Sequence, residues 1–313
     1  MKIGFLTDST CDLPKDIIKK YNIHILPIQI ISGDTKLFDD KQGVVYQKTI
    51  HLIKKTHDII TQPQEPEIIA EFLADLILKN EYDQLLCLMP LKSRSDSFHN
   101  TYIAKEIAER KVNRIRAEDL LPGVRIEAVD SLQISVGLGI LMLQSIYTSK
   151  ASNRLEHIIK NIRFFSQFTQ TYVIPKTLER LYFQGSEKGD SSVGLGTYIV
   201  GTALDIKPII LVHNGKSSAI AKTIGFDKAF DQVFDMMIEH IKLGHLMDRT
   251  INLSYGYTLS DLRNKPSFLE FERIAQQRNI KIFISNMAST LNVNIGLGSF
   301  AISFLSKKIP THL

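Results

Sequence analysis

The sequence has few residues that could cross-link the chain through disulfides or metal ions. Only two of its 313 residues are cysteines, Cys11 and Cys87. Two cysteines cannot form a disulfide framework or a zinc knuckle. The nine histidines show no HxxxH spacing, so they do not indicate a metal site either. We therefore expect a protein that works without a bound metal or cofactor.

Long apolar runs are also missing from the sequence. No stretch approaches the roughly 18 to 20 apolar residues that a membrane-spanning helix needs. The opening residues, MKIGFLTDST, do not show the basic and then apolar order of a secretory signal. These features predict a cytoplasmic protein without a membrane span.

The common nucleotide-binding and hydrolase motifs do not occur. Three GxG triplets lie at 137–139, 194–196 and 296–298, but none continues to GxGxxG, and the chain contains no GxxxxGK[ST] or GxSxG. The net charge is +5, with the basic excess in residues 151–313. That half contains no basic run interleaved with aromatic residues. The sequence therefore does not indicate a dinucleotide-binding protein, a P-loop nucleotide-binding protein or a hydrolase. We also expect no nucleic-acid partner.

The length and the hydrophobic pattern predict two α/β domains. A chain of 313 residues is about twice the usual size of one domain, and 44% hydrophobic and 23% charged residues are typical of a folded protein. In residues 1–168, apolar β-branched runs alternate with amphipathic segments, which predicts a mostly parallel sheet in an α/β/α sandwich. Residues 169–313 are less regular, and we expect a mixed-sheet α/β domain there.

The expected elements follow from these patterns. In the first half we expect strands at 3–7, 24–31, 85–89 and 125–129, and helices at 45–55, 66–79, 98–109, 132–147 and within 151–168. In the second half we expect strands at 171–175, 206–213, 219–223, 250–255 and 280–285, and a helix at 226–241. The pair Asn214-Gly215 between two of these strands predicts a hairpin.

Four polar clusters lie at strand ends or in a loop before a helix, where ligands of open α/β sheets bind. They are Asp8-Ser9-Thr10, Thr61-Gln62-Pro63, Lys92 to Ser95, and Asp130-Ser131. Such residues are most often helix caps, and Asp12, Pro14 and Asp16 also suit a helix start. In Ser93-Arg94-Ser95, two hydroxyls flank a guanidinium just before a helix, so this cluster could equally bind an anion.

Several longer segments carry a resemblance to a known family. They are TDSTCDLP at 7–14, VDSLQISVGLG at 129–139, KGDSSVGLG at 188–196, LDIKPIILVHNGKSSAIAKTIGF at 204–226, and MASTLNVNIGLGSFAISF at 287–304. In this order they resemble the DegV family of bacterial fatty-acid-binding proteins over almost the whole chain. The resemblance implies a two-domain α/β protein that holds one long-chain fatty acid, with its carboxylate near the interdomain cleft.

The resemblance also implies partners and site residues. It implies a carrier without catalysis of its own that presents the fatty acid to a separate fatty acid kinase subunit. The expected ligand-binding residues are Thr61, Ser93, Ser95, Arg94, Ser9, Asn294 and Gly296. Two positions depart from the family pattern: Ile60 replaces the first hydroxyl of a TSQPS loop, and Asn294 stands where many relatives have a histidine before GPG.

The acyl chain requires an apolar tunnel. The candidates are the helix 132–147, the strand 206–212 and the segment 295–304, although each of them could be plain core. Two other functions stay open. One is an enzyme that acts on an acyl or phosphorylated small molecule, with Ser93 or Ser95 as nucleophile. The other is a sensor whose domain contacts change when a ligand binds.

Overall fold

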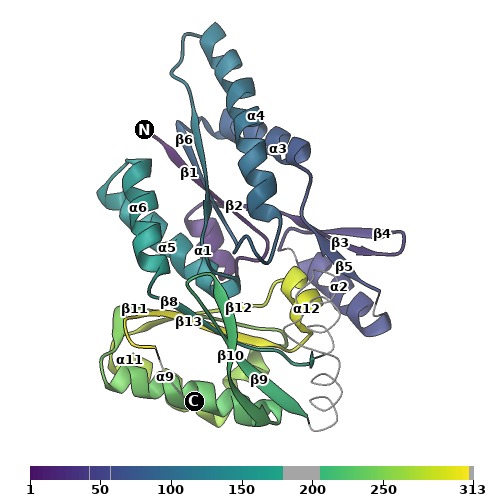
Figure 1. The fold of residues 1–313 in the computed structure, drawn as a ribbon, viewed down its shortest axis with the longest axis vertical. Coiled ribbons are helices and arrows are strands. Elements are labelled where there is room, and N and C mark those ends of the chain that lie inside the picture. Colours follow the sequence, from purple (N-terminus) through teal and green to yellow (C-terminus); the bar gives the residue numbers. More distant parts are fainter. Residues whose placement is uncertain (42, 57, 179–204, 310–313) are drawn as a thin grey trace.

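Two large β-sheets, each with its own helices, and one small sheet form the protein (Figure 1). The computed structural model describes residues 1–41, 43–56, 58–178 and 205–309. The segment 188–196, which contributes to the family resemblance, lies outside the described residues. All strands of the first large sheet precede residue 131 and all strands of the second follow residue 168. The domain division at residue 168 stays a prediction.

The first large sheet, sheet A, is parallel throughout. Its strands lie in the order β2-β1-β6-β7, with β1 at Ile3–Asp8, β2 at Ile23–Leu26, β6 at Gln84–Met89 and β7 at Arg125–Asp130. Helices α3 (Pro66–Asn80) and α4 (Ser97–Glu118) cover one face. Helices α1 (Lys15–Lys20), α5 (Ser135–Ala151) and α6 (Leu155–Ser166) cover the other. The predicted parallel α/β/α arrangement is confirmed.

Alternating side chains of sheet A explain why helices cover both faces. Leu6 and Cys87 pack toward α3 and α4, whereas Phe5 and Leu86 pack toward α5 and α6. Since successive residues of a strand point to opposite faces, continuously apolar strands such as β6 must be covered on both sides.

The second large sheet, sheet C, is mixed, as the sequence predicted. Its strands lie in the order β10-β9-β8-β13-β11-β12, and among these described strands only the neighbours β11 and β12 run parallel. The strands are β8 (Thr169–Ile174), β9 (Ile206–His213), β10 (Lys216–Ile224), β11 (Leu246–Tyr255), β12 (Lys281–Asn286) and β13 (Phe300–Ser306). Helices α9 (Phe226–Lys242), α10 (Leu259–Arg263) and α11 (Pro266–Gln277) pack on one face through a core rich in phenylalanine.

Helix α5 is buried because it lies between the two large sheets. Every residue from Ser135 to Ile146 is buried. The approach is so close that a Cβ atom at Gly139 would lie 2.6 Å from Nδ2 of Asn252 on β11 and 2.7 Å from the carbonyl oxygen of Asp12. Only glycine fits at this position, since any side chain would push the halves apart.

The small sheet, sheet B, was not predicted. It has the antiparallel order β4-β3-β5, with β3 at Ile28–Ser32, β4 at Thr35–Asp39 and β5 at Ile60–Gln62. The sequence predicted one strand over 24–31, but the chain leaves sheet A at Pro27 and begins β3 one residue later. Proline has no N–H for a sheet hydrogen bond, which accounts for the break. Helix α2 (Gly43–Lys55) follows β4.

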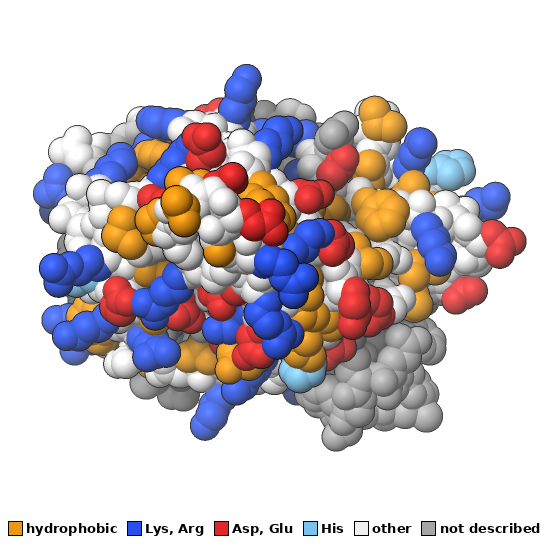
Figure 2. Space-filling view, turned by 90° about the horizontal axis from the view of Figure 1, so that it is seen from above, with side chains coloured by type: hydrophobic (Ala, Val, Ile, Leu, Met, Phe, Trp, Pro, Cys, Tyr) orange, Lys and Arg blue, Asp and Glu red, His pale blue; other side chains and the backbone are white. Residues whose placement is uncertain are grey.

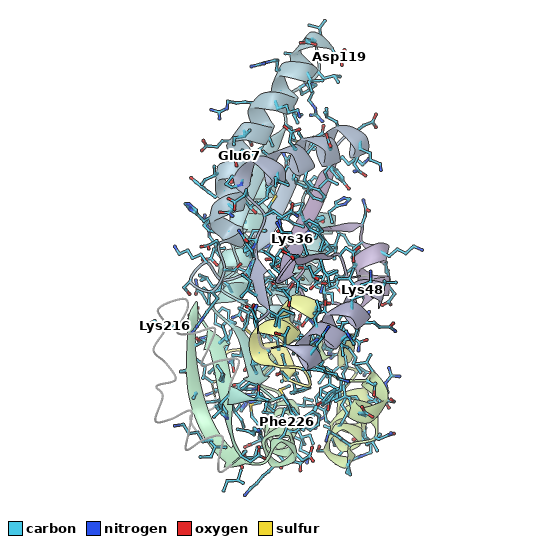
Figure 3. The ribbon with its side chains drawn as sticks, turned by 90° about the vertical axis from the view of Figure 1, so that its right-hand side faces the viewer. Lys36, Lys48, Glu67, Asp119, Lys216 and Phe226 are labelled. Atoms are coloured by element: carbon cyan, nitrogen blue, oxygen red, sulfur yellow. The ribbon has the colours of Figure 1, made fainter. Side chains whose placement is uncertain are left out.

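The short helix α12 (Ser289–Ile295) belongs to the second half of the chain but packs against the first. Figure 1 shows it beside β3, β5 and α2, and Figure 3 shows it next to the helix that carries Lys48. Val293 of α12 contributes to a small apolar cluster with Ile30 of β3 and Ile59. The position of α12 therefore couples the two halves.

The buried carboxylate of Asp12 also connects the two halves. Oδ2 accepts hydrogen bonds from Ser135 Oγ and Ser254 Oγ, both at 2.8 Å. Oδ1 accepts the backbone N–H of Ala288 at 2.9 Å and lies 3.5 Å from Nζ of Lys41. These donors come from α5, β11, the residue before α12 and the connection after β4. One side chain thus joins four separate parts of the chain.

This role corrects the expectation that Asp12 caps a helix. Helix α1 begins at Lys15, and no side chain caps it. The acidic residue expected in its first turn, Asp16, is in place. Asp12 is fully buried, and both of its carboxylate oxygens accept hydrogen bonds from residues at least 29 positions away in the chain. Its side chain therefore does not cap the nearby helix α1.

Removing the Asp12 carboxylate should strongly destabilise the protein. In Asp12→Ala, two hydroxyls, one backbone N–H and one ammonium group lose their acceptor in a buried place. We expect the free energy of unfolding to fall by about 3 kcal/mol or more, as measured by urea denaturation. The matched control is Asp75→Ala on the exposed side of α3, which should stay within about 0.5 kcal/mol of wild type. Equal stability of the two variants would contradict this role of Asp12.

Candidate functional site

Two of the predicted ligand-binding residues, Thr61 and Asn294, meet at the junction of the halves. Thr61 lies on β5 and Asn294 on α12, 233 positions apart in the chain, and Thr61 Oγ1 donates a hydrogen bond of 3.0 Å to Asn294 Oδ1. Both residues are only partly buried. The bond directs the hydroxyl hydrogen of Thr61 at Asn294 and leaves the Nδ2 hydrogens of Asn294 available to an acceptor.

Helix α12 is held in this place by a second buried carboxylate, Asp39 at the end of β4. Its Oδ2 accepts both the backbone N–H and the hydroxyl of Thr290, each at 2.8 Å. With Asp12 on the N–H of Ala288, two acidic side chains of the first half therefore hold the first turn of α12. Acidic groups are favourable there because the N–H groups at a helix start have no partner within the helix.

Ser9 also belongs to this interface. Its Oγ accepts the backbone N–H of Ile28 at 3.2 Å and lies 3.4 Å from Thr290 Oγ1. Ser9 is fully buried. In these contacts Ser9 supports the start of β3 and the first turn of α12, and its role as a ligand contact stays a prediction.

Gly296 ends α12 in a backbone conformation that requires glycine. Its φ angle is +95° and its ψ angle is 143°, and its N–H donates to the carbonyl oxygen of Asn292 at 3.1 Å. A Cβ atom here would lie 3.1 Å from Thr177 Oγ1. Glycine at this position therefore fixes where the chain turns from α12 toward β13, close to Asn294.

The loop after β6 carries the remaining predicted residues. Ser93 and Arg94 are exposed and Ser95 is partly buried. Ser95 Oγ donates to Ser97 Oγ at 2.9 Å and accepts the backbone N–H of Ser97 at 3.2 Å. The Arg94 guanidinium donates a hydrogen bond to Ser217 Oγ on β10. Arg94 therefore connects this loop to the second half of the chain.

Strands β9 and β10 form the hairpin predicted from Asn214-Gly215, and its tip reaches the first half of the chain. Figure 3 shows Lys216, the first residue of β10, at the upper end of this hairpin. A Cβ atom at Gly215 would lie 3.3 Å from a methyl group of Leu132 and 3.5 Å from one of Leu91. The hairpin tip thus packs against the loops that follow β6 and β7.

Burial governs the electrostatics of the two acidic residues of the 7–14 segment. Desolvation raises the pKa of Asp12, and the positive charge of Lys41 and three hydrogen-bond donors oppose this rise. Desolvation also raises the pKa of Asp8, while hydrogen bonds from Thr10 and Ser97 and the charge of Lys41 oppose this rise. It raises the pKa of the Cys11 thiol between them to about 12. A thiol that remains protonated is a poor nucleophile, so Cys11 acts here as a packing residue.

The sequence did not identify Asp12, Asp39 and Thr290 as members of the site. Asp12 stands in the TDSTCDLP segment and Thr290 in the MASTLNVN segment, so both lie within the motifs that carry the resemblance. The hydrogen-bond partners of Asp12 and Asp39 are between 123 and 276 residues away, apart from Lys41. The motifs identified the two segments, but no local pattern indicated which of their side chains would form hydrogen bonds.

Neither a metal site nor a base for Ser95 is formed by the described residues. No group of three or more His, Cys, Asp or Glu side chains could hold a metal ion within residues 1–41, 43–56, 58–178 and 205–309. Over the same ranges, Ser95 Oγ bonds only to Ser97. The enzyme hypothesis, which requires His or Lys within hydrogen-bond reach of Ser93 or Ser95, gains no support from these contacts.

The surface shows mixed charge on the face that is seen from above in Figure 2, where basic and acidic side chains lie among one another. None of the helices in the described part of the chain is long and apolar enough to cross a membrane.

These features define a class of protein: a two-sheet α/β protein in which polar loops at the strand ends of a parallel sheet meet a short helix from a mixed-sheet half. The chain belongs to the DegV family. The sequence model of this family, described as "Uncharacterised protein, DegV family", matches residues 2–307. The predicted resemblance is confirmed.

Curated and solved relatives agree with this assignment. A DegV domain-containing protein of Xanthomonas axonopodis pv. citri is 30% identical over 311 residues, which cover 98% of each chain. A solved DegV family protein from Thermus thermophilus, described as fatty acid binding, shares 18% identity with a TM-score of 0.73 over 98% of this chain and 100% of that chain. A stearic acid-binding protein from Eubacterium ventriosum shares 19% identity with a TM-score of 0.73 over 98% of both chains. At these identities the two solved structures show a common fold.

The conformation of Gly296 leads to a stability prediction. In Gly296→Ala, a side chain is forced into a backbone region that only glycine adopts freely, and it crowds Thr177. We expect a loss of about 1 to 2 kcal/mol in the free energy of unfolding. The control is Gly43→Ala at the start of α2, where a Cβ atom would meet nothing within 4 Å. If both alanine variants unfold at the same urea concentration, the proposed constraint on the end of α12 is wrong.

Proposed function

We propose that this protein binds one long-chain fatty acid, with the carboxylate held by hydroxyl and amide groups at the junction of the halves. The observation that supports this most directly is the hydrogen bond between Thr61 and Asn294, because it brings predicted ligand residues of both halves together. Solved DegV proteins from Thermus thermophilus and Bacillus subtilis, described as fatty acid binding, have the same fold. The carrier hypothesis therefore fits both the geometry and the relatives.

The head group needs several donors. An ionised carboxylate loses several kcal/mol of hydration when it is buried, so it requires two or three hydrogen bonds in return. Asn294 Nδ2 can donate to it while Oδ1 remains bonded to Thr61. The hydroxyls of Ser93 and Ser95 and the backbone N–H groups near Gly296 are the further proposed donors. Because Asn294 stands where many relatives have a histidine, Arg94 is the only charged residue among these proposed donors.

The proposed place for the acyl chain is a buried apolar cluster that includes Ile295, the residue after Asn294. The cluster contains Val136, Val173, Met287, Ala288, Leu291 and Ala301, with Ile134, Ile210 and Ile295 partly buried against it. Each of the three predicted tail segments contributes to it, through Val136, Ile210 and Ile295. Burying about sixteen carbons at roughly 0.8 kcal/mol each offers about 12 kcal/mol before association costs, which is enough for tight binding. We propose that the chain runs along this cluster.

Presentation to a separate fatty acid kinase subunit in the cytoplasm is the second part of the proposal. Hydroxyl donors satisfy a carboxylate without a strong ion pair, so its oxygens stay available for phosphoryl transfer. Ser93 and Arg94 are exposed in the loop after β6, where a partner could reach the head group. The protein itself would act as a carrier and catalyse no step.

Binding of palmitate tests the first part. We expect the wild-type protein to bind palmitate. We expect the dissociation constant to rise about tenfold in Thr61→Val, which loses the hydroxyl that orients Asn294, and in Ser95→Ala, which loses a proposed donor to the carboxylate. The measurement is isothermal titration calorimetry on delipidated protein. Ser149→Ala on the last turns of α5, where the hydroxyl bonds only to the carbonyl oxygen of Ile146, is the control and should bind as wild type does. Failure of the wild-type protein to bind palmitate or stearate would refute the proposal.

Phosphoryl transfer separates the carrier from the enzyme alternative. With ATP and a fatty acid kinase subunit of the same bacterium, the palmitate-loaded protein should yield acyl phosphate, detected as its hydroxamate. The loaded protein with ATP alone should yield none. Turnover without the kinase subunit that disappears in Ser93→Ala or Ser95→Ala would instead support a nucleophilic enzyme.

A further inference from the structure

A polar pocket of about 530 Å³ lies where helix α5 connects to helix α6 in the first half of the chain. The residues that line it are Ser152, Arg154, Glu156, His157 and Lys160. Figure 1 shows α6 at the left of the molecule, whereas β5 and α12, which carry Thr61 and Asn294, lie at the right. The pocket is therefore separate from the proposed fatty-acid site.

Helical spacing brings three nitrogen-bearing side chains to this pocket. Arg154 stands directly before α6, and His157 and Lys160 lie in the first two turns of that helix. Residues three positions apart are neighbours on a helix surface, so the three side chains follow one another along it. All three are exposed, which leaves them accessible to a ligand from solution.

The two cations of the pocket are not neutralised by the protein. Within the described residues, neither the Arg154 guanidinium nor the Lys160 ammonium group forms an ion pair or a hydrogen bond. The acidic residue of the lining, Glu156, is paired with Arg125 of β7. The pocket therefore carries an excess of positive charge.

His157 adds a neutral donor to this charge. The side-chain nitrogen Nδ2 of Asn161 lies 3.3 Å from Nε2 of His157 and 3.4 Å from Oγ1 of Thr148. An amide nitrogen can only donate, so Nε2 of His157 accepts. The hydrogen of the neutral imidazole then lies on Nδ1, which has no partner within the described residues and is available to an acceptor.

The complete set of donors suits a phosphate group. It comprises the N–H groups of Arg154, the ammonium group of Lys160, the Nδ1–H of His157 and the hydroxyl of Ser152. A carboxylate offers two oxygens, whereas a phosphate group offers three oxygens and nearly two negative charges. The planar arginine fork matches two phosphate oxygens at once. Pockets for small molecules span about 300 to 1,000 Å³, so this one has room for more than the phosphate itself.

We propose that this pocket binds the phosphate group of a phosphorylated ligand, with Arg154 and Lys160 as the charged contacts and His157 and Ser152 as neutral donors. The inference does not rest on the proposed function, because none of these residues belongs to the fatty-acid site. A soluble phosphate ester and a lipid headgroup share the chemistry that the pocket recognises, and the experiment separates these two sources.

Nuclear magnetic resonance of the His157 imidazole tests the soluble source, with the signals assigned by comparison with His157→Gln. Glucose 6-phosphate should shift these signals saturably in the millimolar range, and glucose should leave them unchanged. The apparent affinity should fall as NaCl is raised from about 0.05 M to about 0.5 M, because salt screens exposed charges. Since the signals belong to a residue of the pocket, they distinguish binding there from binding at the loop of Arg94.

Sedimentation with vesicles tests the lipid source. The probes are vesicles of phosphatidylcholine with phosphatidic acid and vesicles of phosphatidylcholine alone. Binding of glucose 6-phosphate supports the pocket with a soluble ligand. Sedimentation only with the phosphatidic acid vesicles supports it with a lipid headgroup. A wild-type protein that responds to neither probe would overturn the proposal.

Substitutions identify the groups that bind. Arg154→Gln/Lys160→Gln should weaken binding of the responding probe by about tenfold or more, because two charge-assisted contacts are lost. Arg154→Lys keeps the charge but loses the fork, and it should weaken binding by about threefold. The control, Arg110→Gln/Arg114→Gln on α4, removes two exposed positive charges elsewhere and should bind as wild type does.

Two results with these variants would also overturn the proposal. Unchanged binding in Arg154→Gln/Lys160→Gln would place the phosphate outside the pocket. An equal loss in the α4 control would mean that overall positive charge attracts the probe. Because all of the substituted side chains are exposed, each variant should unfold at nearly the wild-type urea concentration, so that a change in binding is not a consequence of unfolding.

Discussion

The buried carboxylate of Asp12 is the interaction on which the rest of this structure depends. Its donors come from α5, β11, the residue before α12 and Lys41 after β4, so the two halves share one acceptor. A buried ion pair adds little net stability against an apolar replacement, but removal of one partner is costly. If the two halves moved apart, buried polar groups in both would lose their hydrogen-bond partners. This cost keeps the halves in the observed arrangement.

The position of the proposed site follows from this constraint. Asp12 and Asp39 hold the first turn of α12, Gly296 ends that helix, and Asn294 in its last turn then meets Thr61. The proposed head-group contacts thus come from both halves of the chain. The proposed fatty acid needs polar groups for its carboxylate and an apolar region for its chain, and the cluster that contains Val136 and Leu291 is the proposed apolar region.

Much of the architecture could be predicted from the sequence because it rests on local patterns. The strand 206–213 and the hairpin at Asn214-Gly215 agree with β9, β10 and the turn between them. Sheet B was missed because β4 is largely exposed and β5 has only three residues, so neither has an apolar pattern. Strand β13 was missed because all of its residues are buried and no alternation distinguishes it.

The site was predicted less completely than the fold. The resemblance pointed to Thr61 and Asn294, which the structure brings together, but the roles of Asp12 and Asp39 depend on partners far away in the chain. Local reading made Asp12 a helix cap, which is the commonest role of an aspartate before a helix. Only the three-dimensional arrangement shows that the donors to Asp12 come from distant parts of the chain.

Hydrogen exchange at the backbone amides of Ala288 and Thr290 tests most directly whether the two carboxylates hold the halves together. If Asp12 and Asp39 bind these amides as described, both should exchange only on global unfolding, at rates set by the overall stability of the protein. Exchange of these two amides as fast as that of the exposed turn residue Gly33 would contradict the account.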